Sequence, residues 1–134
     1  MIEKPYLLFL GDVPDQLAAK TAQGVVDWRP ETCMGQLRLD GCKADVRLPD
    51  MTINQAVMKG VRTFVVGVAN AGGVLPPQWT QTIVQAIEAG MDVASGMHTR
   101  LVDVPEIRQA AERHGAMLFD VRHPTQVFAT GKGT

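Results

Sequence analysis

Short apolar runs alternate with amphipathic stretches along almost the whole chain. Continuous apolar runs are typical of parallel strands that are buried on both faces of a sheet. About five runs are therefore predicted as strands, namely Pro5–Gly11, Cys33–Leu39, Thr63–Ala69, Met91–Gly96 and Ala116–Arg122. The run at Cys33–Leu39 contains more polar residues, so we expect that strand to be less buried.

The stretches between these runs repeat apolar side chains at helical spacing. The predicted helices are Asp15–Trp28, Ile53–Lys59, Pro76–Gly90 and Val104–Gly115. The buried stripe of the first is expected to be Leu17, Ala18, Thr21, Val25 and Trp28, and that of the third Trp79, Ile83, Val84 and Ile87. Asp12 or Asp15 is expected to cap the first helix, and Asp50 or Thr52 the second.

Strands that alternate with helices in this way form right-handed βαβ units around a parallel sheet. The sequence therefore predicts an α/β domain, a Rossmann-like open and mainly parallel sheet of about five strands with helices on both faces. This domain is expected to span residues 1–122. The tail at residues 123–134 loses the periodicity and collects Pro, Thr and Gly, as expected of a linker toward a further domain.

Composition narrows the class of protein without naming a function. The chain has 134 residues, a hydrophobic fraction of 46% and a formal charge of −1, so nucleic acid and anionic membranes are not expected as main partners. The first apolar run is too short for a signal peptide or a membrane span. Cys33 and Cys42 lack metal-site or redox spacing, which favours reduced thiols in a cytoplasmic protein and no metal site.

Ligands of an open parallel sheet bind at the carboxyl ends of its strands, so the loops at that edge are the candidate site. The first loop carries Gly11 and Asp12 without the GxGxxG pattern of dinucleotide-binding domains, and the charge of Asp12 would repel a phosphate. NAD or FAD is therefore not expected. Asp12 is predicted either to cap the next helix or to receive the ammonium group of a substrate.

The loop after the third strand contains Asn70, Gly72 and Gly73. The two glycines permit positive φ angles and close approach of a ligand to the backbone. Amides exposed before the following helix can hold an anion. The alternative is that the glycines make a wide turn without a ligand.

The last two loops gather polar and chargeable side chains. Ser95, His98 and Arg100 follow the fourth strand, and Arg122 and His123 follow the fifth. The histidines are candidate general bases and the arginines candidate contacts for a carboxylate or phosphate. The alternatives are structural histidines and solvated arginines. The pattern contains no catalytic triad, paired carboxylates or metal cluster, and the final "TGKGT" lacks the spacing of a P-loop.

Several segments together resemble a known family. "KPYLLFLGDVPDQLAAKTAQGVVDWRPE", "LRLDGCKADVRLPDMT", "VVGVANAGGVLPPQW", "EAGMDVASGMHTRL" and "RHGAMLFDVRHPTQ" are similar to the N-terminal domain of a bacterial and archaeal family long catalogued as a domain of unknown function. Some members are assigned as D-glutamate N-acetyltransferases. In that family a Rossmann-like N-terminal domain precedes a C-terminal domain with a P-loop-type motif.

The resemblance implies the N-terminal domain of an enzyme that transfers acetyl from acetyl-CoA to the amine of D-glutamate, with the isolated domain inactive. The resemblance carries over no catalytic residue, so the candidates are loop positions in the matching segments: Asn70, Gly72 and Gly73 as backbone donors, and His98 or His123 as the base. Arg100 and Arg122 would contact carboxylate or phosphate. Expected partners are D-glutamate, the C-terminal domain, with a possible nucleotide there, and further copies of the chain. The alternatives are a substrate-binding domain of a P-loop nucleotide-dependent enzyme and a non-catalytic oligomerisation domain.

Overall fold

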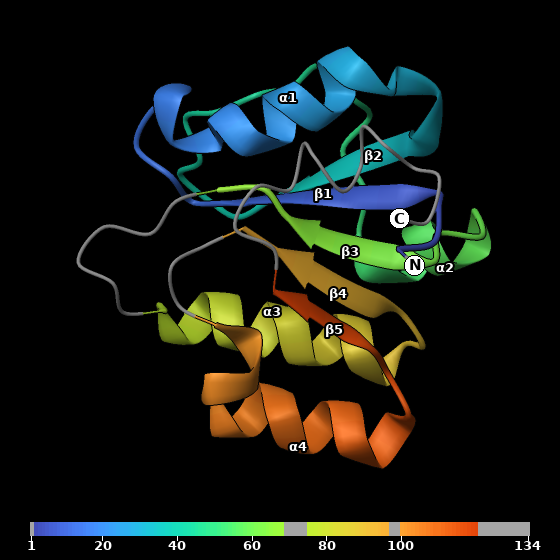
Figure 1. Cartoon of the computed structure of the whole chain (residues 1–134). Coiled ribbons are helices and arrows are strands. Elements are labelled where there is room, and N and C mark those ends of the chain that lie inside the picture. Colours follow the sequence, from blue (N-terminus) through green and yellow to red (C-terminus); the bar gives the residue numbers. More distant parts are fainter. Residues whose placement is uncertain (1, 69–74, 97–99, 121–134) are drawn as a thin grey trace.

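The computed structural model describes residues 2–68, 75–96 and 100–120. Its centre is a parallel sheet of the strands β1 (Tyr6–Gly11), β2 (Cys33–Arg38), β3 (Thr63–Val66), β4 (Asp92–Ser95) and β5 (Leu118–Asp120). The strands lie in the order β2-β1-β3-β4-β5 (Figure 1). The predicted α/β fold with a five-stranded parallel sheet is therefore confirmed.

Burial follows the position of each strand in the sheet. Every residue of β1 and β3 is buried, since both are interior strands, whereas the edge strands β2 and β5 are partly exposed. In the shared register, Phe9 of β1 lies opposite Leu37 of β2 and Val66 of β3. The prediction that the second strand is less buried is confirmed, because a strand at the edge of a sheet has a neighbour on one side only.

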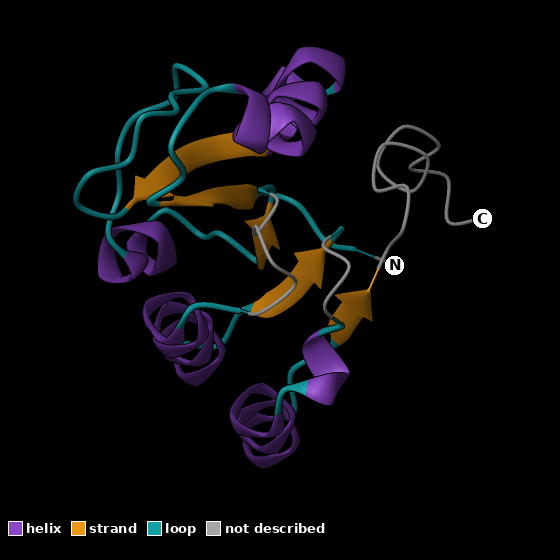
Figure 2. Ribbon diagram, turned by 90° about the vertical axis from the view of Figure 1, so that its left-hand side faces the viewer, coloured by secondary structure: helices purple, strands orange, loops and turns teal. Residues whose placement is uncertain are grey.

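Helices cover both faces of the sheet. Helix α1 (Lys20–Trp28) lies on one face, and α2 (Ile53–Met58), α3 (Pro77–Glu88) and α4 (Pro105–His114) lie on the other (Figure 2). Short 3-10 helices at Leu17–Ala19, Pro30–Thr32 and Leu101–Asp103 join them to the strands. Rings of Phe9 and Phe64, 5.2 Å apart, pack in the core between the sheet and the helices.

The predicted third and fifth strands are too long. Strand β3 ends at Val66. The carbonyl of the next residue, Gly67, accepts a hydrogen bond from the Ala22 N–H of α1 at 2.9 Å instead of bonding to a neighbouring strand. Strand β5 begins at Leu118, two residues later than predicted, and its described part runs to Asp120. Residues 69 and 121–122 of the predicted strands lie outside the described residues.

The predicted buried stripe of the first helix is wrong at its ends. Leu17 is 75% exposed and Trp28 is 58% exposed, whereas Ala22 and Val25 are buried. The helix packs so closely on β3 that small residues must face the sheet, as the contact between Ala22 and Gly67 shows. The helical spacing of apolar residues could not reveal this. It shows which residues share a face of the helix, but not how closely the helix packs on the sheet.

Of the two helices with predicted caps, α2 has a side-chain cap, whereas α1 begins at Lys20, after a 3-10 helix, and has none. The Asp15 carboxylate accepts from the Ala18 N–H at 3.0 Å. Thr52 caps α2 in a reciprocal pair with Gln55, each side chain bonding the other residue's backbone N–H. Asp12 caps no helix, because its carboxylate is bound to Trp79.

Candidate functional site

The carboxyl ends of all five strands meet at one edge of the sheet, which we call the carboxyl edge. The strand order reverses between β1 and β3, since the chain passes from β1 outward to β2 and then returns to the other side of β1. Open parallel sheets bind ligands at such a switch point. Figure 2 looks onto this edge, with β1 and β3 side by side at its centre.

Of the predicted site residues, Asp12, Ser95 and Arg100 are described by the structure. The others lie outside the described residues, namely Asn70, Gly72, Gly73, His98, Arg122 and His123. Asp12 follows β1 at the switch point, and Arg100 lies at the far end of the same edge, next to β5. Three strand spacings of ~4.8 Å separate β1 from β5, or roughly 14 Å.

Asp12 is held by a residue from a distant part of the chain. Its Oδ1 accepts a hydrogen bond from the indole Nε1–H of Trp79 at 2.8 Å. Trp79 lies in the first turn of α3, is 3% exposed, and packs edge-on against Phe9 with ring centroids 5.7 Å apart. Gly11 has φ +57°, and a Cβ there would lie 2.6 Å from the indole. The indole therefore fills the space beneath the first loop and fixes the orientation of the Asp12 carboxylate.

Three backbone amides at the start of the helical segment that follows β1 are bonded within the protein. The Ala18 N–H is bonded to Asp15, the Ala19 N–H to the Gln16 carbonyl, and the Ala22 N–H to the Gly67 carbonyl. A dinucleotide pyrophosphate would need amides of this kind at the start of the first helix. These amides are bound to the protein's own acceptors, so the α1 terminus is unlike the phosphate cradle of a dinucleotide-binding domain.

Asp120 lies at the end of the carboxyl edge formed by β4 and β5 and binds the chain before α4. It was not among the site residues predicted from the sequence. Its Oδ1 accepts from the Leu101 N–H at 2.6 Å, and so holds the start of the 3-10 helix before α4. Ser95 lies opposite Asp120 in the register and is 2% exposed, so its side chain belongs to the interior. Arg100 is exposed beside this pair. Asp120 lies inside the predicted strand Ala116–Arg122, so the sequence pattern did not mark it as a loop residue.

A polar hollow of about 470 Å³ lies beside the end of β2 and includes Arg38, Asp40, Cys42 and Asp50 in its lining. The Arg38 guanidinium binds both carboxylate oxygens of Asp50 at 2.8 Å and reaches Asp45 at 3.6 Å. Hydrogen bonds from Arg38 lower the pKa of Asp50, and the side-chain amide of Gln36 lowers the pKa of Asp45. The arginine is therefore engaged by the protein's own carboxylates.

This ion pair predicts a dependence of stability on pH. A carboxyl group whose pKa is lowered by folding stabilises the folded state above its unfolded pKa of about 4, and the contribution is lost as the pH falls through the folded value. Asp50→Asn should therefore lower the free energy of unfolding by up to about 1 kcal/mol at pH 7, since the pair is partly exposed. Urea unfolding at pH 7 and near pH 3 should show the difference from wild type shrinking in acid. Asp40→Asn is the control, and an equal loss at both pH values would contradict the prediction.

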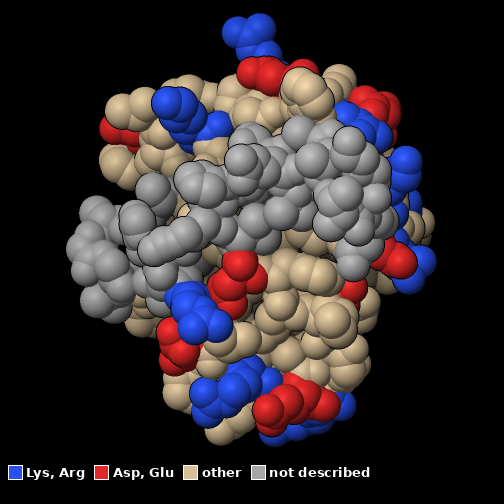
Figure 3. Space-filling view, viewed as in Figure 1, with Lys and Arg blue, Asp and Glu red and all other residues tan. Residues whose placement is uncertain are grey.

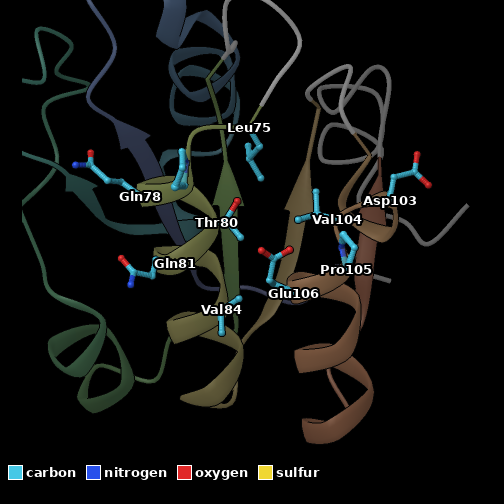
Figure 4. Close-up of a pocket in the computed structure, with 10 residues that line it drawn as sticks. Leu75, Gln78, Thr80, Gln81, Val84, Asp103, Val104, Pro105 and Glu106 are labelled. Atoms are coloured by element: carbon cyan, nitrogen blue, oxygen red, sulfur yellow. The ribbon is translucent and has the colours of Figure 1, made fainter.

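A second hollow, of about 720 Å³, lies between the amino-terminal turns of α3 and α4. Figure 4 shows Thr80 and Val84 of α3 pointing toward α4, and Glu106 of α4 pointing back toward α3. Leu75 and Val104 add apolar surface. The volume lies within the range of small-molecule sites, which is about 300–1,000 Å³.

Charge and metal ligands are spread thinly over the described residues. In the part of the face in Figure 3 that the structure describes, acidic and basic side chains are interspersed around α4. Among residues 2–68, 75–96 and 100–120, no group of three His, Cys, Asp or Glu side chains is placed to hold a metal ion. The described helices include none with the length and apolar character needed to cross a membrane.

The fold and the switch-point site define a Rossmann-like α/β domain with a parallel sheet. Residues 37–124 match the family described as a domain of unknown function (DUF1611_N), a Rossmann-like domain, and the chain belongs to this family. A solved structure of a DUF1611 family protein from Anabaena variabilis shares the fold, with a TM-score of 0.71 and 19% identity over 90% of this chain and 37% of that protein. Homoserine dehydrogenase from S. aureus has the same fold class, with a TM-score of 0.56 and 17% identity over 88% of this chain and 33% of that one.

Two curated relatives are much closer in sequence. D-glutamate N-acetyltransferase from Tritonibacter scottomollicae is 49% identical over 99% of this chain, and D-glutamate N-acetyltransferase from Pseudoalteromonas sp is 46% identical over 98%. The chain spans about 40% of the length of each of these relatives. The similarity therefore relates this chain to one part of each enzyme.

Proposed function

We propose that this chain is the N-terminal domain of an N-acetyltransferase that transfers acetyl from acetyl-CoA to the amine of D-glutamate. The observation that carries the proposal is the identity of 49% and 46% with two enzymes of that name across nearly the whole chain. A second domain would follow this one and complete the active site, so the isolated domain would be inactive.

The geometry of the carboxyl edge supports this proposal. The edge has a carboxylate, Asp12, at the switch point and an exposed arginine, Arg100, beside β5 at the end of the same edge. A substrate with an ammonium group and two carboxylates needs both a negatively charged and a positively charged contact in the protein. The hollow between α3 and α4 lies at the amino-terminal turns of these helices, which follow the carboxyl edge. Its apolar surface could hold the pantetheine arm of an acyl donor.

The reaction requires the neutral amine of D-glutamate to attack the thioester carbonyl. A bond forms between nitrogen and the carbonyl carbon, the tetrahedral oxyanion is stabilised by hydrogen-bond donors, and its collapse breaks the carbon–sulfur bond. A base takes the proton that the amine loses, and the thiolate of CoA leaves. We assign the base to His98 or His123 and the oxyanion donors to the backbone at Asn70, Gly72 and Gly73. Arg100 and Arg122 would complete the contacts to the substrates, whereas Ser95 is too deeply buried to take part.

The direct test is an acetyl-transfer assay of the whole protein with acetyl-CoA and D-glutamate. Formation of N-acetyl-D-glutamate and free CoA is expected, and no transfer to D-glutamate would reject the proposal. Calorimetric titration of this chain with each substrate separately then assigns them to a domain. Binding of acetyl-CoA alone would place the donor here, and binding of D-glutamate alone would place the acceptor here.

Arg100→Ala is expected to lower kcat/KM of the whole protein by about 10–100-fold, since a hydrogen bond to a charged group contributes about 1.5–3 kcal/mol. Arg113→Ala is the matched control, because Arg113 is also an exposed arginine but lies in the last turn of α4, at the opposite edge of the sheet. Steady-state kinetics with each substrate varied in turn identifies which one Arg100 contacts. Equal activity of the two variants would remove Arg100 from the site.

A further inference from the structure

Asp12 is exposed at the switch point, yet its orientation is fixed from below. The Nε1–H of Trp79 donates to Oδ1 at 2.8 Å, and the indole itself is 3% exposed. Phe9 packs against the ring, and the backbone at Gly11 lies so close to it that the ring cannot move toward the loop. A carboxylate held in this way has one oxygen bound to the protein and a second that can meet a ligand without further ordering.

Asp12 has no ion-pair partner among the described residues. The ion pairs of the described residues join Arg29 to Glu31, Arg38 to Asp45 and Asp50, and Arg62 to Glu3, and none includes Asp12. The carboxylates near the end of β2 differ in this respect, since Arg38 binds them. In the part of the chain that the structure describes, Asp12 is therefore an oriented anion that a cation from outside could satisfy.

The nature of that cation follows from the surroundings. No set of three metal-ligating side chains occurs among the described residues, and the charge of Asp12 repels the phosphates of an acyl donor. A primary ammonium group fits, because it is compact and donates hydrogen bonds to a carboxylate oxygen. We propose that Asp12, positioned by Trp79, binds the amino group of the amino-acid acceptor at the β1–β3 switch point.

This inference rests on the proposed acetyl transfer and adds to it the placement of the acceptor. The acceptor binds as the ammonium ion and loses one proton to solvent to become the neutral amine. It then attacks the thioester and loses a second proton to the base. The N–H group that remains keeps the hydrogen bond to Asp12, which thereby holds the nitrogen in place during attack. Trp79 is a positioning residue, since it acts through Asp12 and is too deeply buried to meet the substrate.

The decisive variant is Asp12→Asn in the whole protein. An asparagine oxygen still accepts from the Trp79 indole, so the fold is retained while the charge is lost. We expect KM for D-glutamate to rise about 10–100-fold, with KM for acetyl-CoA within about twofold. Asp15→Asn is the matched control, because Asp15 lies in the same loop and asparagine can also accept from the Ala18 N–H. An unchanged KM for D-glutamate in Asp12→Asn would mean that Asp12 serves the fold alone.

Two further measurements separate this inference from the proposed function. Glutarate has the two carboxylates of glutamate and no amine, so Asp12→Asn should leave glutarate binding equal or tighter while D-glutamate binding weakens. Loss of both ligands together would overturn the assignment to the amino group. If the wild-type protein transfers no acetyl group to D-glutamate, the proposed function fails, and calorimetry of D-glutamate binding to wild type and Asp12→Asn still decides the role of Asp12.

Trp79→Phe tests the positioning role. Phenylalanine keeps most of the apolar ring and removes the hydrogen bond to Asp12. We expect KM for D-glutamate to rise by about threefold to tenfold with KM for acetyl-CoA unchanged, since the carboxylate keeps its charge but loses its fixed orientation. An equal effect on both substrates would indicate a general structural loss, and would contradict a specific role for the pair.

Discussion

Trp79→Ala is expected to lower the free energy of unfolding by about 3–5 kcal/mol. The indole is 3% exposed, packs edge-on against Phe9 and lies beneath Gly11. Alanine would leave a cavity between the sheet and α3, and would remove the donor to Asp12. The change therefore combines the loss of apolar burial with the loss of the hydrogen bond that joins α3 to the first loop.

The chain has two tryptophans, and the second provides the control. Trp28 at the end of α1 is 58% exposed, so Trp28→Ala should change stability by less than about 1 kcal/mol. Urea unfolding followed by far-UV circular dichroism measures both variants. If Trp79→Ala is too unstable to purify, Trp79→Phe provides the measurement, with a smaller expected loss. Equal losses for the two alanine variants would contradict the packing described for α3.

Gly67→Ala is expected to lower the free energy of unfolding by about 3 kcal/mol or more. A Cβ at Gly67 would lie 2.5 Å from the Cβ of Ala22, 2.7 Å from its Cα and 2.9 Å from its N. These atoms belong to the backbone of α1 or lie next to it, so no flexible side chain can move aside. The substitution would push α1 from the sheet and break the hydrogen bond from the Ala22 N–H to the Gly67 carbonyl.

Gly41→Ala separates this steric effect from the general cost of replacing glycine. Gly41 has φ +86° and has no atoms within 4 Å of the position of an added Cβ. Its replacement should cost about 1 kcal/mol from backbone conformation alone. Thermal and urea unfolding of the two variants should rank Gly67→Ala well below Gly41→Ala in stability. The reverse order would mean that α1 can move away from β3 at little cost.

Periodicity identified the elements because the information lies within each segment. The buried run at Tyr6–Gly11 and the stripe of Trp79, Ile83 and Ile87 show the strand and helix they form. Capping also depends on neighbours in sequence. Thr52 caps α2 as the sequence allowed, whereas Asp15 accepts from the Ala18 N–H of the 3-10 helix that precedes α1. The alternation of strands and helices then restricted the sheet to a parallel one, since connections between parallel strands are right-handed and need a crossover.

Several features of the candidate site were decided by contacts between distant residues. Asp12 was predicted either to cap a helix or to face a ligand, and Trp79, 67 residues away, turned out to be its partner. The pairing of Arg38 with Asp50 and of Asp120 with the Leu101 N–H likewise depends on how loops meet at the sheet edge. His98, His123, Arg122 and the glycine loop remain predictions of the sequence, since they lie outside the described residues.

The sequence by itself determined the order of elements and the parallel sheet, and it predicts the edge at which a ligand would bind. These follow from hydrogen bonding and apolar spacing over a few residues. The tertiary structure decided which face of α1 is buried, how deeply Ser95 lies and which group holds the Asp12 carboxylate. Those features depend on strand order and on the distance of closest approach between packed elements, and neither is set by local spacing.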